Sequence, residues 1–195
     1  MNQRLLSNGS SVLLADVQAL SDDRDLMIDW VGVKGLSYPI TVLDRVHGTQ
    51  QTVGSVNMFV ELPAEVKGTH MSRFVEILER HRHEITFKGV ERMLREMRER
   101  LETERARVEV SFPYFVTKEA PVSQARGLVG YDCKILGWAG RLEAMHLQVR
   151  VPVTTLCPCS KQISQSGAHN QRGEVTVQVR LNGMVWIEEL VEVVE

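Results

Sequence analysis

The sequence of 195 residues predicts an α+β fold, in which antiparallel strands form a sheet and helices cover one of its faces. Two observations lead to this prediction. Most of the chain falls into segments whose apolar and polar residues alternate, as they do in strands that bury one face. The two segments with strong helical periodicity lie together, between the second and third of these strands, and helices grouped in this way are typical of α+β proteins.

Residues 1–30 show little patterning, and we expect a flexible N-terminal extension with a short helix near residues 15–20. The predicted strands that follow are residues 33–45, 51–62, 107–116, 126–138, 141–154 and 174–181. Gly48 lies between the first two strands, where its permissive backbone suits a tight turn. Apolar residues at every second position in the second strand predict one strongly buried face.

The first predicted helix begins near Thr69 or Ser72, either of which could cap it. A second helix covers residues 87–104 and has an apolar stripe with glutamate–arginine pairs four residues apart on its other face. The last predicted helix covers residues 186–194. Its acidic residues are expected to lie on its surface; they are Glu188, Glu189 and Glu192.

Composition excludes several classes of protein. An apolar content of 43% and a charged content of 25% are ordinary for a globular protein. The net charge of −2 does not indicate nucleic-acid binding, and the sequence has neither an apolar run that could cross a membrane nor a secretion signal. We therefore expect a cytoplasmic protein. Three cysteines do not suggest a disulfide scaffold, and Cys133 is expected to be buried as a small apolar residue.

The segment at residues 156–172 is the densest in groups that bind metals or do chemistry, and it is expected to form a loop between two strands. Cys157, Cys159 and His169 are suitable ligands for zinc, provided that the loop reverses direction, which Gly167 permits. So few ligands suggest an open site. On the residues alone, a packed or incidental cysteine pair is the commoner outcome, and a redox pair is disfavoured by the spacing.

Several motifs together resemble the signature of GTP cyclohydrolase type IB, from about Val31 to the last residue. Residues 157–172 have the pattern Cys-Pro-Cys-Ser-Lys-x-Ile-Ser-x-x-Gly-Ala-His-Asn-Gln-Arg, and residues 67–74 are Lys-Gly-Thr-His-Met-Ser-Arg-Phe. Shorter matches occur at residues 111–113, 120–123 and 187–189. The resemblance implies a tunnelling fold of two tandem modules, at residues 31–125 and 126–195, with the second module incomplete.

The resemblance also implies a reaction, in which GTP and water give 7,8-dihydroneopterin triphosphate and formate at the start of tetrahydrofolate synthesis. It implies a divalent metal (Zn or Mn, with Fe as a third option) and a homotetramer with active sites at subunit interfaces. Cys157 and His169 would be the metal ligands, with Cys159 as the runner-up ligand, and His70 would transfer protons or contact phosphate. The candidates for binding the triphosphate are Lys67, Arg73, Lys161 and Arg172.

Two alternatives stay open on the sequence. A related cyclohydrolase that forms a cyclic phosphate product would share Cys157 and His169. The other alternative is a truncated, non-catalytic module of the same fold, since the family's third metal ligand and its purine-binding glutamate are expected beyond Glu195.

Overall fold

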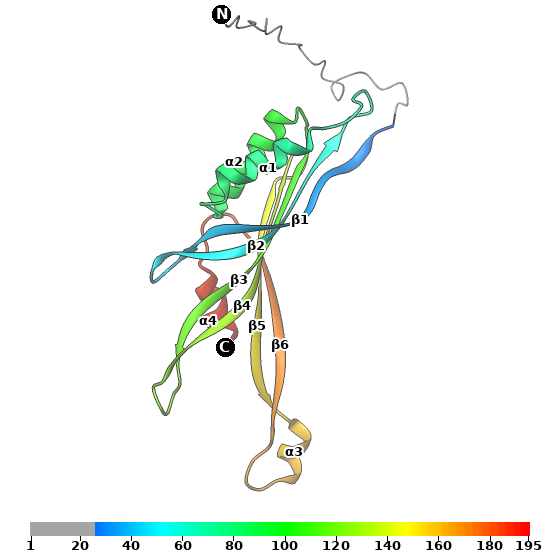
Figure 1. Ribbon diagram of the computed structural model, residues 1–195. Coiled ribbons are helices and arrows are strands. Elements are labelled where there is room, and N and C mark those ends of the chain that lie inside the picture. The colour runs from blue at the N-terminus through cyan, green and yellow to red at the C-terminus, as the bar shows by residue number, and fades with distance from the viewer. Residues whose placement is uncertain (1–25) are drawn as a thin grey trace, which may run out of the picture.

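The computed structural model describes residues 26–195 (Figure 1). The helix expected near residues 15–20 lies outside the described residues. The elements in chain order are β1 (Ile28–Asp44), β2 (Gly48–Leu62), α1 (Met71–His81), α2 (Phe87–Arg100), β3 (Ala106–Glu119), β4 (Arg126–Ala139), β5 (Ala144–Leu156), α3 (Pro158–Ile163), β6 (Asn170–Arg180) and α4 (Ile187–Val194). Each predicted strand is present, and β1 begins at Ile28, within the range predicted as an extension.

The strands form one antiparallel sheet in which every strand pairs with the next one along the chain, in the order β1-β2-β3-β4-β5-β6. The predicted α+β class is therefore confirmed. The expected boundary between two modules, at residues 125 and 126, falls at the turn between β3 and β4. These two strands pair over their whole length, from Ala106 opposite Ala139 to Glu119 opposite Arg126. The sheet is thus continuous across that boundary, and the division into two modules stays a prediction.

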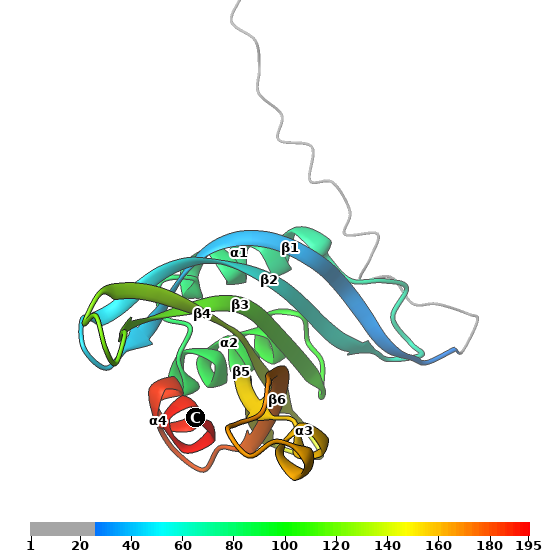
Figure 2. The ribbon, with the colours of Figure 1, turned by 90° about the horizontal axis from the view of Figure 1, so that it is seen from below.

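The helices α1, α2 and α4 lie on the same side of the curved sheet (Figure 2). Alternate residues of the strands point to that side and are buried with the helices in one core. The helix residues that enter this core include Phe74, Ile77, Leu78, Val90, Leu94, Met97, Ile187 and Val191. Gly137 of β4 shows how closely α2 approaches the sheet, because a Cβ atom there would lie 2.9 Å from Leu94 Cδ1.

Local hydrogen bonds fix the ends of α1 and α2. Thr86 caps α2 as its side chain accepts a hydrogen bond from Gly89 N, at 3.0 Å. The N-cap of α1 is His70, without a side-chain cap bond, so the expectation that Thr69 or Ser72 caps this helix is wrong. Arg73 Nη1 donates to Arg100 O at 2.7 Å, which joins the start of α1 to the end of α2.

Helix α4 docks onto the sheet through carboxylates. Glu188 is 7% exposed, and its Oε1 accepts hydrogen bonds from Arg45 N at 2.8 Å and from Tyr114 Oη at 2.6 Å. The expectation that Glu188 lies on the helix surface is therefore wrong. The amphipathic pattern of a short helix does not show that a strand side chain, Tyr114, provides a partner inside the core. Glu192, as expected, is exposed, and it pairs with Arg45 at 2.9 Å.

Among residues 26–195, no helix combines the length and the apolar composition that crossing a bilayer requires.

Candidate metal centre

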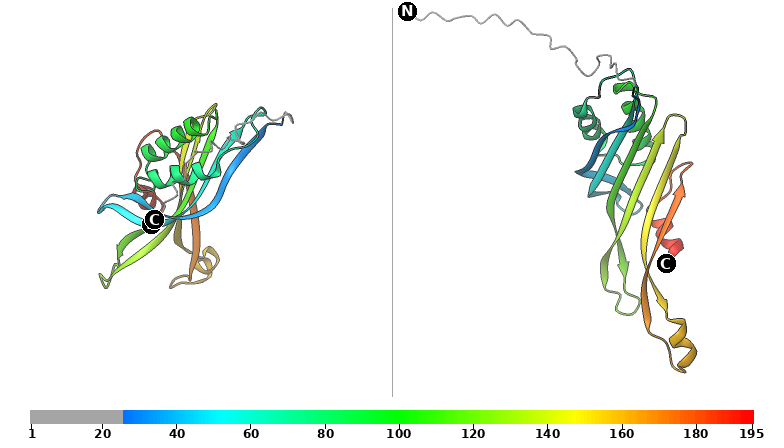
Figure 3. Two further views of the ribbon diagram at one scale, coloured as in Figure 1. Left: turned by 45° about the horizontal axis from the view of Figure 1, so that its top comes forward. Right: turned by 90° about the vertical axis from the view of Figure 1, so that its right-hand side faces the viewer.

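The predicted loop is carried by a long hairpin that projects beyond the helices (Figures 1 and 3). Strands β5 and β6 pair as far as Leu156 opposite Asn170. The chain then forms α3, with Pro158 in its first turn, where its missing N–H and fixed φ suit the start of a helix. Gly167 has φ 137°, a conformation that residues with a Cβ rarely adopt, and it lies on the return to β6.

Cys157 and His169 are brought together by the register of this hairpin. Since Leu156 lies opposite Asn170, the next pair outward is Cys157 and His169, and Cys157 N donates to His169 O at 3.1 Å. Residues that face each other in this way have Cα atoms about 5 Å apart. The loop therefore reverses as the sequence predicted, and the two candidate ligands lie side by side although His169 is twelve positions after Cys157 in the chain.

The surroundings of Cys157 favour its thiolate. The backbone N–H of Ser160, followed by the Ser160 hydroxyl, holds the pKa of the Cys157 thiol below its usual value, with smaller help from Cys159. A lowered thiol pKa increases the fraction of thiolate, which is the form that binds metals. Cys157 is 8% exposed, whereas Cys159 and His169 are exposed.

Ser160 is a site residue that the sequence reasoning missed. Its Oγ lies 2.8 Å from His169 Nδ1 and also within hydrogen-bond reach of the Cys157 thiol. A sequence signal for it existed. Ser160 is three residues after Cys157, the N-cap of α3, and a side chain at this position can reach back to the cap residue.

The donor set is suited to a borderline metal ion. A residue whose thiol has a lowered pKa is joined through its backbone to a histidine where two strands end, and thiolate and imidazole are preferred ligands of zinc. Within residues 26–195, no three His, Cys, Asp or Glu side chains are close enough to hold a metal together. The described part of the chain thus offers two candidate ligands, a number that fits an open site rather than a closed structural one.

Two of the predicted triphosphate ligands lie near this pair. Lys161 follows Ser160 in α3, and its side chain is exposed. Arg172 is exposed on β6 and lines a cavity of about 490 Å³ together with the ends of β5 and β6. Among the described residues, neither side chain has an acidic partner.

The other predicted group lies elsewhere. Lys67, His70 and Arg73 are at the start of α1, near the end of the sheet that is remote from α3 (Figures 1 and 3). Arg73 is half-buried and bonded to Arg100 O, whereas Lys67 is exposed. Within one chain, the structure does not bring this group to Cys157 and His169.

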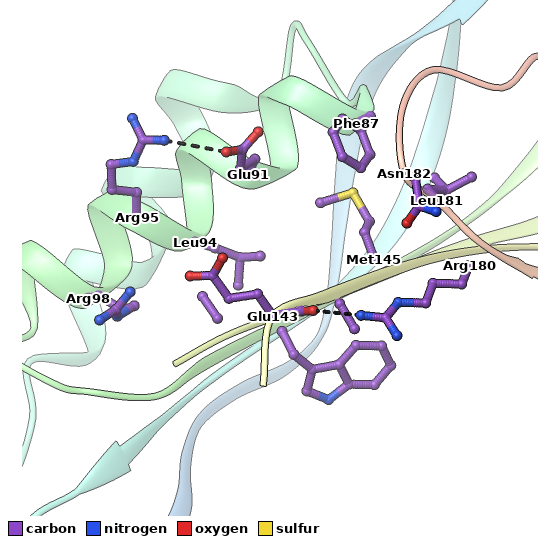
Figure 4. Close-up of a pocket in the computed structure, with 13 residues that line it drawn as sticks. Phe87, Glu91, Leu94, Arg95, Arg98, Glu143, Met145, Arg180, Leu181 and Asn182 are labelled. Atoms are coloured by element: carbon purple, nitrogen blue, oxygen red, sulfur yellow. Dashed lines mark hydrogen bonds and ion pairs between the residues drawn. The ribbon is translucent and has the colours of Figure 1, made fainter. Parts of the chain in front are cut away.

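A separate cavity of about 340 Å³ lies between α2 and the adjoining ends of β4, β5 and β6 (Figure 4). None of the predicted site residues lines it. The charged side chains that do are Glu91, Arg95, Arg98, Glu143 and Arg180. Arg95 pairs with Glu91 at 3.4 Å, and Arg180 donates to Glu143 O at 3.2 Å. Among these charged side chains, Glu91 and Arg95 form an ion pair, whereas Arg180 bonds to a backbone carbonyl.

Comparison with known proteins gives consistent matches. The sequence model described as "Type I GTP cyclohydrolase folE2" matches residues 14–195. GTP cyclohydrolase FolE2 of Nitrosococcus oceani is 51% identical over 93% of this chain and 68% of the relative's length. The FolE2 proteins of Kosmotoga olearia and Geobacter sulfurreducens are 50% and 51% identical, over 93% of this chain and 71% and 70% of their own lengths.

Proposed function

The chain belongs to the family of type I GTP cyclohydrolases named FolE2, and from this membership we propose that it converts GTP and water to 7,8-dihydroneopterin triphosphate and formate, the first step of tetrahydrofolate synthesis. The observation that carries the proposal is the direct opposition of Cys157 and His169 at the end of a hairpin, within the motif that the chain shares with this family. A hydrolase of this kind needs water to be activated beside a bound purine nucleotide.

Cys157 and His169 would hold a divalent metal ion, zinc or manganese, with iron as a third option. When bound there, such an ion supplies a Lewis acid that lowers the pKa of a coordinated water, to about 7 in zinc enzymes. The neighbouring residues of the chain prepare the two ligands. The N–H groups and the hydroxyl beside Cys157 lower the pKa of its thiol and so favour the thiolate, and Cys157 N holds the backbone of His169 in place.

Charged residues around the hairpin would bind the substrate. Lys161 and Arg172 present exposed cationic groups on the hairpin that carries the ligand pair, and a triphosphate requires several such donors. Arg172 is also placed on a cavity wall, where its fork of N–H groups suits phosphate oxygens. Cys159, two residues after Cys157, would tune the site as a neighbouring thiol.

His70, with Lys67 and Arg73, would come from a neighbouring subunit. The distance between the start of α1 and the α3 hairpin in one chain supports an active site at a subunit interface (Figure 1). In this arrangement His70 would transfer protons, while Lys67 and Arg73 would contact phosphate. We propose a homotetramer on this basis. All three cysteines are free thiols, which suits the reducing cytoplasm as the location of the enzyme.

The test is turnover of GTP by the purified protein, with and without added Zn²⁺ or Mn²⁺. We expect metal-dependent release of formate and a product with the mass of 7,8-dihydroneopterin triphosphate. A product with the mass of a cyclic phosphate would instead identify the related cyclohydrolase. Absence of both products from metal-loaded, assembled protein would contradict the proposal.

A further inference from the structure

Ser160 connects the two proposed metal ligands. Its Oγ lies 2.8 Å from His169 Nδ1, and its hydroxyl also bonds to the Cys157 thiol. Ser160 belongs to α3, whereas Cys157 and His169 lie just beyond the last strand pair, so the first turn of the helix brings this hydroxyl to both residues.

The protons of this group can be counted. A serine hydroxyl has one hydrogen to donate and lone pairs that accept. The Ser160 Oγ lies against His169 Nδ1, so Nε2 is the ring nitrogen left for a metal ion. A neutral imidazole that binds a metal through Nε2 carries its proton on Nδ1, and the Ser160 oxygen accepts the hydrogen bond from that N–H.

We propose that Ser160 is a positioning residue that holds His169 in the tautomer protonated at Nδ1 and thereby presents Nε2 as the metal-binding nitrogen. The inference rests on the proposed role of Cys157 and His169 as ligands. A histidine ligand is commonly oriented through its other ring nitrogen, which also fixes the tautomer. Within residues 26–195, Ser160 is the partner of the His169 ring.

Three variants separate this role from a general role in the loop. Ser160→Ala removes the hydroxyl, and Ser160→Thr retains it. Ser164→Ala is the matched control, because Ser164 ends the same helix and its Oγ accepts from Ser166 N at 3.3 Å, within the same loop. We expect Ser160→Ala to lower the affinity for Zn²⁺ about 10- to 100-fold, the usual cost of losing such a partner. Ser160→Thr and Ser164→Ala should retain the affinity of the parent protein.

The tautomer is measured on the metal-free protein, by ¹H–¹⁵N correlation of the histidine rings, with His169 assigned from the His169→Gln variant. The parent protein and Ser160→Thr should show the proton on Nδ1, and Ser160→Ala should lose this preference. A parent protein with the proton on Nε2, or the same tautomer in Ser160→Ala, would overturn the inference. Because no GTP is needed, these results are independent of turnover, so failure of the proposed function is distinguishable from failure of this inference.

Discussion

At the scale of single residues, the structure distinguishes two cysteines that the sequence left as alternatives. Cys157 lies opposite His169 and is 8% exposed, whereas Cys159 is exposed two residues further along, on α3. The lowered pKa of the Cys157 thiol also marks it as the better ligand, because the thiolate is the binding form. The two predictions at this scale therefore concern Cys157 and the positively charged side chain of Lys161, which lies on the same helix turn.

We predict that Cys157→Ala abolishes metal binding and GTP turnover and leaves the fold unchanged, because it removes one of two ligands that meet at the hairpin end. The loss of Zn²⁺ affinity should exceed the effect of about 100-fold that removal of an outer partner can cause. The metal content per subunit measures the loss of metal, and circular dichroism measures whether the fold is unchanged. Cys159→Ala is the control and should keep most of the metal. Full occupancy in Cys157→Ala would contradict the assignment.

Lys161→Ala should weaken GTP binding about 10-fold or more, the effect expected when a charge-assisted hydrogen bond to phosphate is lost. Binding of guanosine should change little, since guanosine has no phosphate. Titration calorimetry with both ligands tests this difference. Lys88→Ala, which removes an exposed lysine from α2, serves as the control and should affect neither ligand. Equal losses for GTP and guanosine in Lys161→Ala would refute a phosphate contact.

At the scale of elements, α4 illustrates how a short helix is fixed by one buried group. Ile187 and Val191 provide apolar contacts, but the position of the helix also depends on Glu188, which joins the turn after β1 to Tyr114 of β3. Burial raises the pKa of the Tyr114 hydroxyl, and its bond to Glu188 raises it further. Tyr114 therefore stays protonated and remains a donor to the carboxylate.

We predict that Glu188→Ala destabilises the fold by about 1–3 kcal/mol, the usual cost of leaving buried donors without an acceptor. Glu192→Ala is the matched control on the same helix. Its exposed ion pair with Arg45 should contribute at most about 1 kcal/mol. Urea unfolding of the parent protein, Glu188→Ala and Glu192→Ala gives the loss of unfolding free energy for each variant. Equal stability of Glu188→Ala and the parent protein would show that α4 is held by its apolar contacts alone.

At the scale of the whole molecule, the two motif groups lie at opposite ends of one continuous sheet. The hairpin of β5 and β6 carries Cys157 and His169, while the segment before α1 carries His70 (Figure 1). A rigid sheet cannot fold these ends together. A second subunit is therefore the simplest source of the missing group.

We predict that mixed oligomers of His70→Ala and Cys157→Ala subunits regain part of the activity that each variant lacks alone, because some interfaces then combine two intact motifs. Differently tagged subunits are co-expressed, purified through both tags and assayed for GTP turnover. The control mixture, Cys157→Ala with His169→Ala, damages the same motif in every subunit and should stay inactive. An inactive first mixture, with mixed oligomers verified, would count against an interfacial site.

The sequence by itself determined the features that depend on local patterns. Alternation gave the strands, periodicity gave α1 and α2, and the residues at positions 157 and 169 indicated metal-binding chemistry. Only the tertiary structure decided which residues meet: that Cys157 faces His169, that Ser160 bonds to both, and that Glu188 is buried against Tyr114. The physical reason is that strand register and helix docking are set by packing between segments far apart in the chain, whereas patterning reports only on neighbours in sequence.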